Sequence, residues 1–167
     1  MVSIDTSMSE STAQRAGIEY LLPEGRIGLT AEGWFNPVRL DLNPGQGIYL
    51  LQFLSQGGPY VAARLHKGAG PVWAGIAARR PDGSLAIDNS NVEMEIDSWC
   101  RWKLRLLRIG TRETTAVLYV NGGEKARTNW DSTGYEPLKL RAGIARSSAG
   151  AAATVLTAEL WVTGTIG

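Results

Sequence analysis

Three carboxylates alternate along one short segment of the sequence. Glu93, Glu95 and Asp97 lie within NVEMEIDSWC, residues 91–100, and apolar residues separate them. Alternate residues of a β-strand point to the same side, so this spacing could bring two carboxyl groups within the about 5–5.5 Å that retaining glycoside hydrolysis requires. The three groups could also hold Ca²⁺ together with loop carbonyls. Alternation with apolar residues is equally typical of a strand with one side in water, and this interpretation is favoured.

A row of cations follows the carboxylates. Arg101, Lys103 and Arg105 alternate with apolar residues, which predicts a strand with one basic side. If this strand formed a hairpin with the acidic segment, each exposed pair would contribute at most about 1 kcal/mol and the charges would be structural. If the two strands belonged to different sheets, the basic side could bind an acidic glycan, a protein carboxylate surface or a capsid protein. The sequence leaves both alternatives open.

Aromatic residues next to turns are a second kind of candidate binding site. A sugar site commonly combines a flat aromatic ring with polar groups on loops, because the ring stacks while the polar groups bind hydroxyls. The candidates are Tyr60 and Trp73, and then Asn129, Trp130, Asp131 and Tyr135 in the segment TNWDSTGY. The alternative for this segment is a tryptophan that packs back over the end of the fold, helped by an Asx turn.

Composition excludes several kinds of chemistry. The chain has one histidine, His66, and one cysteine, Cys100. A Ser-His-Asp set, a histidine metal cluster and a cysteine-rich metal site are therefore not expected. No catalytic residue, metal site or cofactor is therefore predicted, and Ca²⁺ has no supporting motif. Seventeen basic and sixteen acidic side chains nearly cancel, which argues against nucleic acid as a partner. No run approaches the about 18 apolar residues of a membrane span, so no membrane insertion is expected.

Short apolar runs separated by turn signals extend along the chain. Examples are IYLLQFLS before QGGP, YVAARLHK before GAGP, and TAVLYV before NGGE. Each run has strand length, and the Asn-Gly pair at 121–122 supplies the positive φ angles of a tight hairpin. Strands at a spacing of about 10–15 residues with glycine-bearing turns predict an all-β fold, a two-sheet antiparallel jelly-roll sandwich.

The N-terminus differs from the remainder in composition. Residues 1–15 are rich in Ser and Thr and are expected to form a polar N-terminal arm, whereas residues 16–167 are expected to form a single β-sandwich domain. No signal peptide is visible, which indicates synthesis in the cytoplasm and leaves the final location open, including the surface of a particle.

Several of these segments resemble a known family. The segments LTAEGWFNP, SWCRWKLRLLRIG and AVLYVNGGEKA are similar to the early strand, the tryptophan strand and the hairpin of laminin G-like and concanavalin A-like domains. The resemblance covers about residues 16–167 and implies a concanavalin A-like jelly roll. Its motifs are structural, so it assigns no ligand-binding residue.

Laminarinase-like glycoside hydrolases of that fold use a strand motif Glu-x-Asp-x-(x)-Glu. Glu95 and Asp97 match its first two positions, but Trp99 or Cys100 occupies the third. The acid that protonates the leaving oxygen is therefore missing, and glycoside hydrolysis is the least favoured function.

The function predicted from the sequence is a non-catalytic one. We expect a structural or recognition protein, a surface or decoration subunit of a larger assembly such as a virus particle, with protein partners. The alternative is a carbohydrate-binding, lectin-like adhesion module with a glycan ligand. A lone lectin site binds with only about −4 kcal/mol, so both interpretations predict a multivalent assembly.

Overall fold

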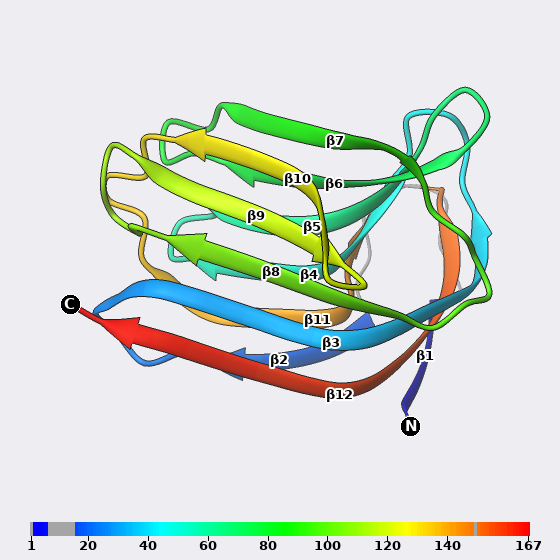
Figure 1. Ribbon diagram of the computed structural model, residues 1–167, viewed down its shortest axis with the longest axis horizontal. Helices are drawn as coiled ribbons and strands as arrows, with labels where there is room; N and C mark the ends of the chain where they lie inside the picture. Colours follow the sequence, from blue (N-terminus) through cyan, green and yellow to red (C-terminus); the bar gives the residue numbers. More distant parts are fainter. Residues whose placement is uncertain (1, 7–15, 149) are drawn as a thin grey trace.

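The regular secondary structure of the described residues consists of two antiparallel sheets. The computed structural model describes residues 2–6, 16–148 and 150–167, and this part contains strands and no helix. Sheet A has the order β1 (Val2–Thr6), β12 (Ala152–Ile166), β3 (Arg26–Asp41), β8 (Cys100–Leu107), β9 (Thr114–Val120) and β10 (Gly123–Trp130). Sheet B has the order β2 (Ala16–Leu21), β11 (Pro137–Ser147), β4 (Gly47–Ser55), β5 (Tyr60–Lys67), β6 (Val72–Arg79) and β7 (Leu85–Glu93). The all-β jelly-roll prediction is confirmed (Figure 1).

The core lies between the sheets and follows from alternation along each strand. In β8, Trp102, Leu104 and Leu106 are completely buried, whereas Arg101 and Arg105 are exposed. Burying one such side chain contributes about 1.5–3 kcal/mol, and the facing side chains of β4 and β5 add to the same cluster. The apolar interior therefore fixes which side of each strand faces solvent.

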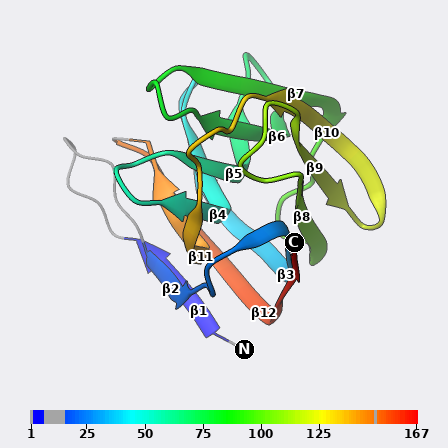
Figure 2. The ribbon, with the colours of Figure 1, turned by 90° about the vertical axis from the view of Figure 1, so that its left-hand side faces the viewer.

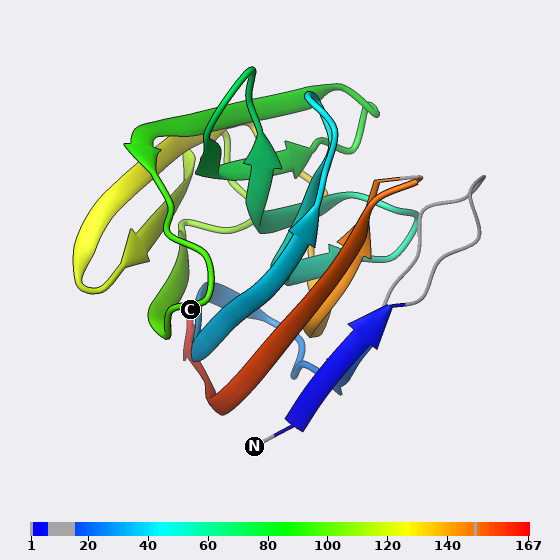
Figure 3. The ribbon, with the colours of Figure 1, turned by 90° about the vertical axis from the view of Figure 1, so that its right-hand side faces the viewer.

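The expected polar arm at residues 1–15 is partly a strand. Val2–Thr6 form β1, which pairs with β12 and makes an edge of sheet A (Figure 3). Residues 7–15 lie outside the described residues. The next described residue, Ala16, is the first residue of β2.

β10 is the second strand of the predicted Asn-Gly hairpin, and its composition is unlike that of the central strands. Its residues, Gly123–Trp130, are mostly polar, and only Ala126 and Trp130 are buried. Because β10 is at an edge of sheet A, these two buried residues are enough to anchor it. Its Arg127 backbone N donates a 2.6 Å hydrogen bond to Asp88 Oδ2 of β7, which ties together the edges of the two sheets (Figure 2).

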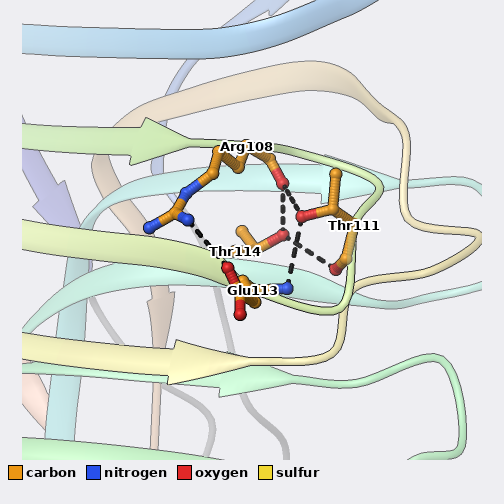
Figure 4. A network of polar contacts seen from close by, with 4 residues as sticks. All are labelled: Arg108, Thr111, Glu113 and Thr114. Atoms are coloured by element: carbon orange, nitrogen blue, oxygen red, sulfur yellow. Dashed lines mark hydrogen bonds and ion pairs between the residues drawn. The ribbon is translucent and has the colours of Figure 1, made fainter.

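Tight turns hold the central strands of sheet A in register. Asn121 and Gly122 between β9 and β10 have φ angles of 51° and 82°, as expected for the Asn-Gly hairpin. Between β8 and β9, the Arg108 carbonyl accepts hydrogen bonds from Thr111 Oγ1 at 2.8 Å and Thr114 Oγ1 at 2.7 Å (Figure 4). Arg108 also forms an ion pair with Glu113.

Trp102 gives a test of the shared core. Replacing it with Ala should lower the free energy of unfolding by about 3–5 kcal/mol, because the cavity cannot be filled by its neighbours. Urea denaturation measures this change. The control is Leu85→Ala, whose side chain is 57% exposed, and it should change stability by no more than about 0.5 kcal/mol. An equal effect of the two substitutions would contradict the assignment of the core.

Candidate functional site

The outer face of sheet B carries a cluster of polar side chains. In β5, Val61, Ala63 and Leu65 point into the core, so Arg64 and His66 point to the opposite side. Arg64 pairs with Tyr49 of β4, and His66 pairs with Gly47. Tyr60, at the start of β5, lies on the same side as Arg64. We call the cluster of Tyr49, Gln52, Tyr60, Arg64 and His66 the sheet-B face.

A β-bulge in β4 brings Tyr49 and Gln52 to the same side. The register shifts between Tyr49 and Leu51, and both Leu50 and Leu51 are fully buried. Without the bulge, residues 49 and 52 would face opposite sides, because side chains of a regular strand alternate. The extra residue therefore allows a tyrosine and a glutamine three positions apart to belong to one surface.

Two tyrosines form a hydrogen-bonded pair on this face. The hydroxyl oxygens of Tyr49 and Tyr60 are 2.9 Å apart, and their ring centroids are 5.5 Å apart at an angle of 48°. The rings pack with the buried residues Ala62 and Ala77. Small side chains at these two positions leave room for the rings to lie close to the sheet.

Arg64 lies between the tyrosines and β7. Its Nη2 donates a 2.7 Å hydrogen bond to Asn89 Oδ1, and Gly75 of β6 lies directly opposite. A Cβ at Gly75 would come within 2.6 Å of Asn89 Oδ1 and 2.8 Å of the Asp88 carbonyl, so a larger residue would displace the partner of Arg64. Burial lowers the pKa of Arg64, while Tyr49 and Tyr60 oppose this shift; the guanidinium stays charged.

His66 is half-buried beside Arg64. Burial lowers its pKa, the charge of Arg64 lowers it further, and a backbone hydrogen bond with Trp73 partly raises it. The net direction is below the ordinary value of 6.5. The imidazole is therefore neutral at neutral pH and can accept a proton.

Further cations flank the cluster at the β11 side of the sheet. Arg141 pairs in register with Gln52 of β4 and with Glu19 of β2. Glu19 accepts bonds from Arg141 Nε at 2.8 Å and Lys139 Nζ at 2.9 Å, and these two partners lower its pKa to about 2. Two cations against one carboxylate leave this region positive, which favours an anionic ligand.

Some buried polar atoms of the sheet-B face have no hydrogen-bond partner within the described residues. Within the described residues, six buried side-chain N or O atoms have no hydrogen-bond partner, and three of them are Gln52 Oε1, Arg64 Nε and His66 Nδ1. An atom of this kind costs about 1–3 kcal/mol if it stays without a partner, so a bound ligand or water that pairs with these three atoms is favoured. The face therefore combines a fixed cation, a neutral imidazole and phenolic hydroxyls, which suits anion binding and proton transfer.

The structure places the predicted aromatic residues in two different environments. Tyr60, which is 5% exposed, belongs to the sheet-B face, and half-buried Trp73 pairs with His66 beside it. Trp130 and Tyr135 are only 5% and 3% exposed and contact each other edge to face. Their rings pack in the core, so neither is available as an open stacking surface for a sugar.

The polar residues of the TNWDSTGY segment are used by the fold itself. Asp131 Oδ1 accepts bonds from the backbone N and the Oγ1 of Thr133, which is the Asx-turn alternative. Buried Ser132 accepts a 2.8 Å bond from the Gly110 backbone N. Asn129 and Trp130 do line a cavity of about 440 Å³, together with Arg108, Arg112 and other residues.

The acidic and basic rows do not pair. β7 ends at Glu93 in sheet B, and Glu95 and Asp97 lie exposed beyond that strand, whereas Arg101, Lys103 and Arg105 belong to β8 in sheet A. The row of three carboxylates is therefore not one strand face. Among the described residues, no group of three or more His, Cys, Asp or Glu side chains could hold a metal ion. No helix in this part of the chain is long and apolar enough to cross a membrane.

Tyr49, Gln52 and Arg64 are the residues of this cluster that sequence reasoning missed, and His66 was considered only as the one histidine of the chain. The alternation in YVAARLHK already places Arg64 and His66 on one side of a strand. The Leu50-Leu51 doublet is the signal for the bulge that adds Gln52.

Comparison with known proteins gives matches at the level of structure. No family model matches the sequence, and no curated protein matches it. Alginate lyase Aly36B has a TM-score of 0.69 and 10% identity, over 96% of this chain and 78% of its own. The family 7 alginate lyase A1-II′, solved as a variant with product, has a TM-score of 0.63 and 15% identity, over 95% and 75%. An endo-β-1,4-glucuronan lyase from the fungus Trichoderma reesei has a TM-score of 0.62 and 9% identity, over 98% and 79%.

These matches correct the function predicted from the sequence. The neighbours are lyases that act on acidic polysaccharides, which contradicts both the non-catalytic decoration subunit and the prediction that the chain is not an enzyme. Virion and capsid roles have no support. The concanavalin A-like jelly roll is confirmed, whereas no laminin G-like family model matches. At 9–15% identity the likeness shows the fold alone.

His66 provides a direct test of the site's electrostatics, because it is the one histidine of the chain. Its pKa, measured by NMR from the imidazole carbon-bound protons, should lie below 6.5. Arg64→Met should raise this pKa, because a neighbouring positive charge is removed. Arg127→Ala, in exposed β10 of the other sheet, is the control and should leave the titration unchanged. A pKa at or above 6.5 in the unmodified protein would contradict the described environment.

Proposed function

We propose that this protein cleaves a uronate-containing polysaccharide by β-elimination on the sheet-B face. The observation that carries the proposal is the cluster of Arg64, His66 and the Tyr49–Tyr60 pair, with unpaired polar atoms among its members. The fold neighbours support this substrate class, since they are alginate and glucuronan lyases, two of them with alginate oligosaccharides bound.

The reaction sets three tasks for the protein. A base removes the proton from the ring carbon that bears the carboxylate, the bond from the adjacent carbon to the glycosidic oxygen breaks, and a double bond forms between the two carbons. The leaving oxygen takes up a proton. Negative charge accumulates on the carboxylate meanwhile, so a fixed positive group must face it.

Arg64 suits the carboxylate. A guanidinium presents paired N–H donors in a plane, which matches the two oxygens of a carboxylate, and it remains charged in a partly buried place. Its hydrogen bond to Asn89 fixes its orientation in advance. Gln52, on the adjacent strand, supplies an amide for the same group or for a ring hydroxyl.

His66 and the tyrosine pair suit the two proton transfers. His66 is neutral at neutral pH because burial and Arg64 lower its pKa, so it serves as the base. Tyr49 is in register with Arg64 and is hydrogen-bonded to Tyr60, so its hydroxyl serves as the proton donor to the leaving oxygen. The second tyrosine holds the first in position and completes the hydrogen-bond chain.

Cleavage can be measured by the ultraviolet absorbance of the new double bond. Alginate, glucuronan and pectate should be offered to the unmodified protein, and at least one should give unsaturated products. His66→Gln, Arg64→Ala and Tyr49→Phe should each lower kcat/KM by about 10²-fold or more, because each removes a separate task. Tyr20→Phe, on exposed edge strand β2, is the matched control and should retain full activity. Normal rates in the first three variants would reject the site.

The pH dependence follows from the state of His66. A base must be deprotonated, so kcat/KM should be constant above the pKa of His66 and fall about tenfold per pH unit below it. Because that pKa is lowered, the fall should begin below pH 6.5. Initial rates across the acid range measure this limb, and thermal unfolding at each pH shows whether the fold persists. A midpoint well above 6.5 would assign the base to another group.

A further inference from the structure

A second polar surface lies on the opposite side of the core, on the outer face of sheet A. It is a groove of about 450 Å³ that crosses four neighbouring strands, with Thr163 on β12, Glu32 on β3, Lys103 and Arg105 on β8, and Tyr119 on β9 among its lining residues. A smaller cavity of about 120 Å³ adjoins it and shares Arg105 and Thr163. Since Tyr49, Arg64 and His66 belong to sheet B, this sheet-A groove is separate from the proposed active site.

Register places several groove side chains, with Trp161 next to them, in two rows across the sheet. Trp161, Glu32, Lys103 and Tyr119 are paired successively from β12 to β9. Thr163, Thr30 and Arg105 form the next row. Neighbouring strands are about 4.8 Å apart and residues two apart on a strand about 6.6 Å, so the two rows extend about 14 Å across the strands and about 7 Å along them. This size suits a segment of a polymer rather than one small ion.

The charge of the groove is positive. Arg101 and Lys103 both pair with Glu32, the latter at 3.4 Å, so one carboxylate is shared by two cations. Arg105 is exposed and has no ion pair or side-chain hydrogen bond with any residue that the structure describes. Three cations and one carboxylate give the groove a net positive charge, which favours carboxylate ligands. The guanidinium of Arg105 can donate two parallel hydrogen bonds to such a ligand.

An exposed aromatic ring lies beside these cations. Trp161 of β12 is 47% exposed, and the guanidinium carbon of Arg101 is 6.0 Å from its ring centroid. That contact holds the ring in place next to the groove. A flat indole face together with threonine hydroxyls and guanidinium groups is a combination that binds sugar rings carrying carboxylates.

We infer that the sheet-A groove is an accessory binding site for acidic polysaccharide, which holds a segment of polymer on the side opposite the cleavage site. The substrate class rests on the proposed function, whereas the groove itself rests on its own charge, shape and aromatic ring. Arg105 binds uronate carboxylates, Trp161 stacks on a sugar ring, and the threonines bind hydroxyls. Because the net charge of the whole chain is close to zero, the attraction of an acidic polymer to this face must come from the local positive charge of the groove.

The test measures polymer binding in a background that cannot use the sheet-B face. In the full chain carrying Arg64→Ala and His66→Gln, affinity for alginate and for glucuronan is measured by affinity electrophoresis or tryptophan fluorescence. Adding Arg105→Ala and Trp161→Ala should weaken binding at least about tenfold. The substitutions remove both the contact between Arg105 and a uronate carboxylate and the ring that stacks on a sugar. Added salt should weaken the remaining attraction.

A matched control and two competitor polymers make the result specific. Arg127→Ala with Tyr20→Ala removes one exposed arginine and one exposed aromatic elsewhere, and it should leave affinity unchanged. Neutral dextran should not bind. Equal affinity of the groove variant and the control, tighter binding of dextran or of single-stranded DNA, or no binding at all would overturn the inference. Thermal unfolding of each variant shows that the fold is kept.

Activity separates this inference from the proposed function. In a chain with an intact sheet-B face, Arg105→Ala with Trp161→Ala should leave kcat on a short oligosaccharide unchanged and raise KM for long polymer several-fold. If no uronate polymer is cleaved but the groove variant loses binding, the lyase proposal fails and the groove stands. If polymer is cleaved and the groove variant binds it normally, the groove fails alone.

Discussion

Burial of one side of each central strand between the two sheets is the constraint on which the remaining structure depends. β5 and β8 show its effect in opposite layers, because Leu65 and Trp102 turn inward while Arg64 and Arg101 are left outward. Interior packing does not restrict the chemistry of the outward positions. Both outer faces therefore carry charged and aromatic side chains on a rigid support, which is what a binding or catalytic surface needs.

The local residue pattern was enough to predict most strands, but it did not predict which sheet each strand joins. YVAARLHK is β5 residue for residue, and the Asn121-Gly122 hairpin has the expected backbone. The relation between the acidic and basic rows, however, depends on which sheet each strand joins. Consecutive β7 and β8 lie in different sheets, and nothing within either segment encodes that separation. The second strand of that hairpin, β10, consists mostly of polar residues, so the pattern of its own residues does not set its length.

The candidate site was harder to predict than the fold, and the reason differs between residues. Trp130 looked like a loop residue that could bind a sugar, but Tyr135 and the β8–β9 turn draw its segment into the core. His66 looked inert because no second histidine accompanies it. Its environment comes from Arg64 and the tyrosine pair, and chemistry based on an arginine with phenols leaves no compact motif in a sequence.

The bulge of β4 has a consequence for how this protein can vary. It lies between Tyr49 and Leu51, so the two halves of β4 differ by one residue in their register with β5. Leu50 has no partner in the register with β5, so loss of one leucine of the doublet would make β4 regular and leave Tyr49 and Gln52 on the side where they now lie. The extra residue thus adds a second buried leucine to the core and moves no other side chain of β4 to the opposite side.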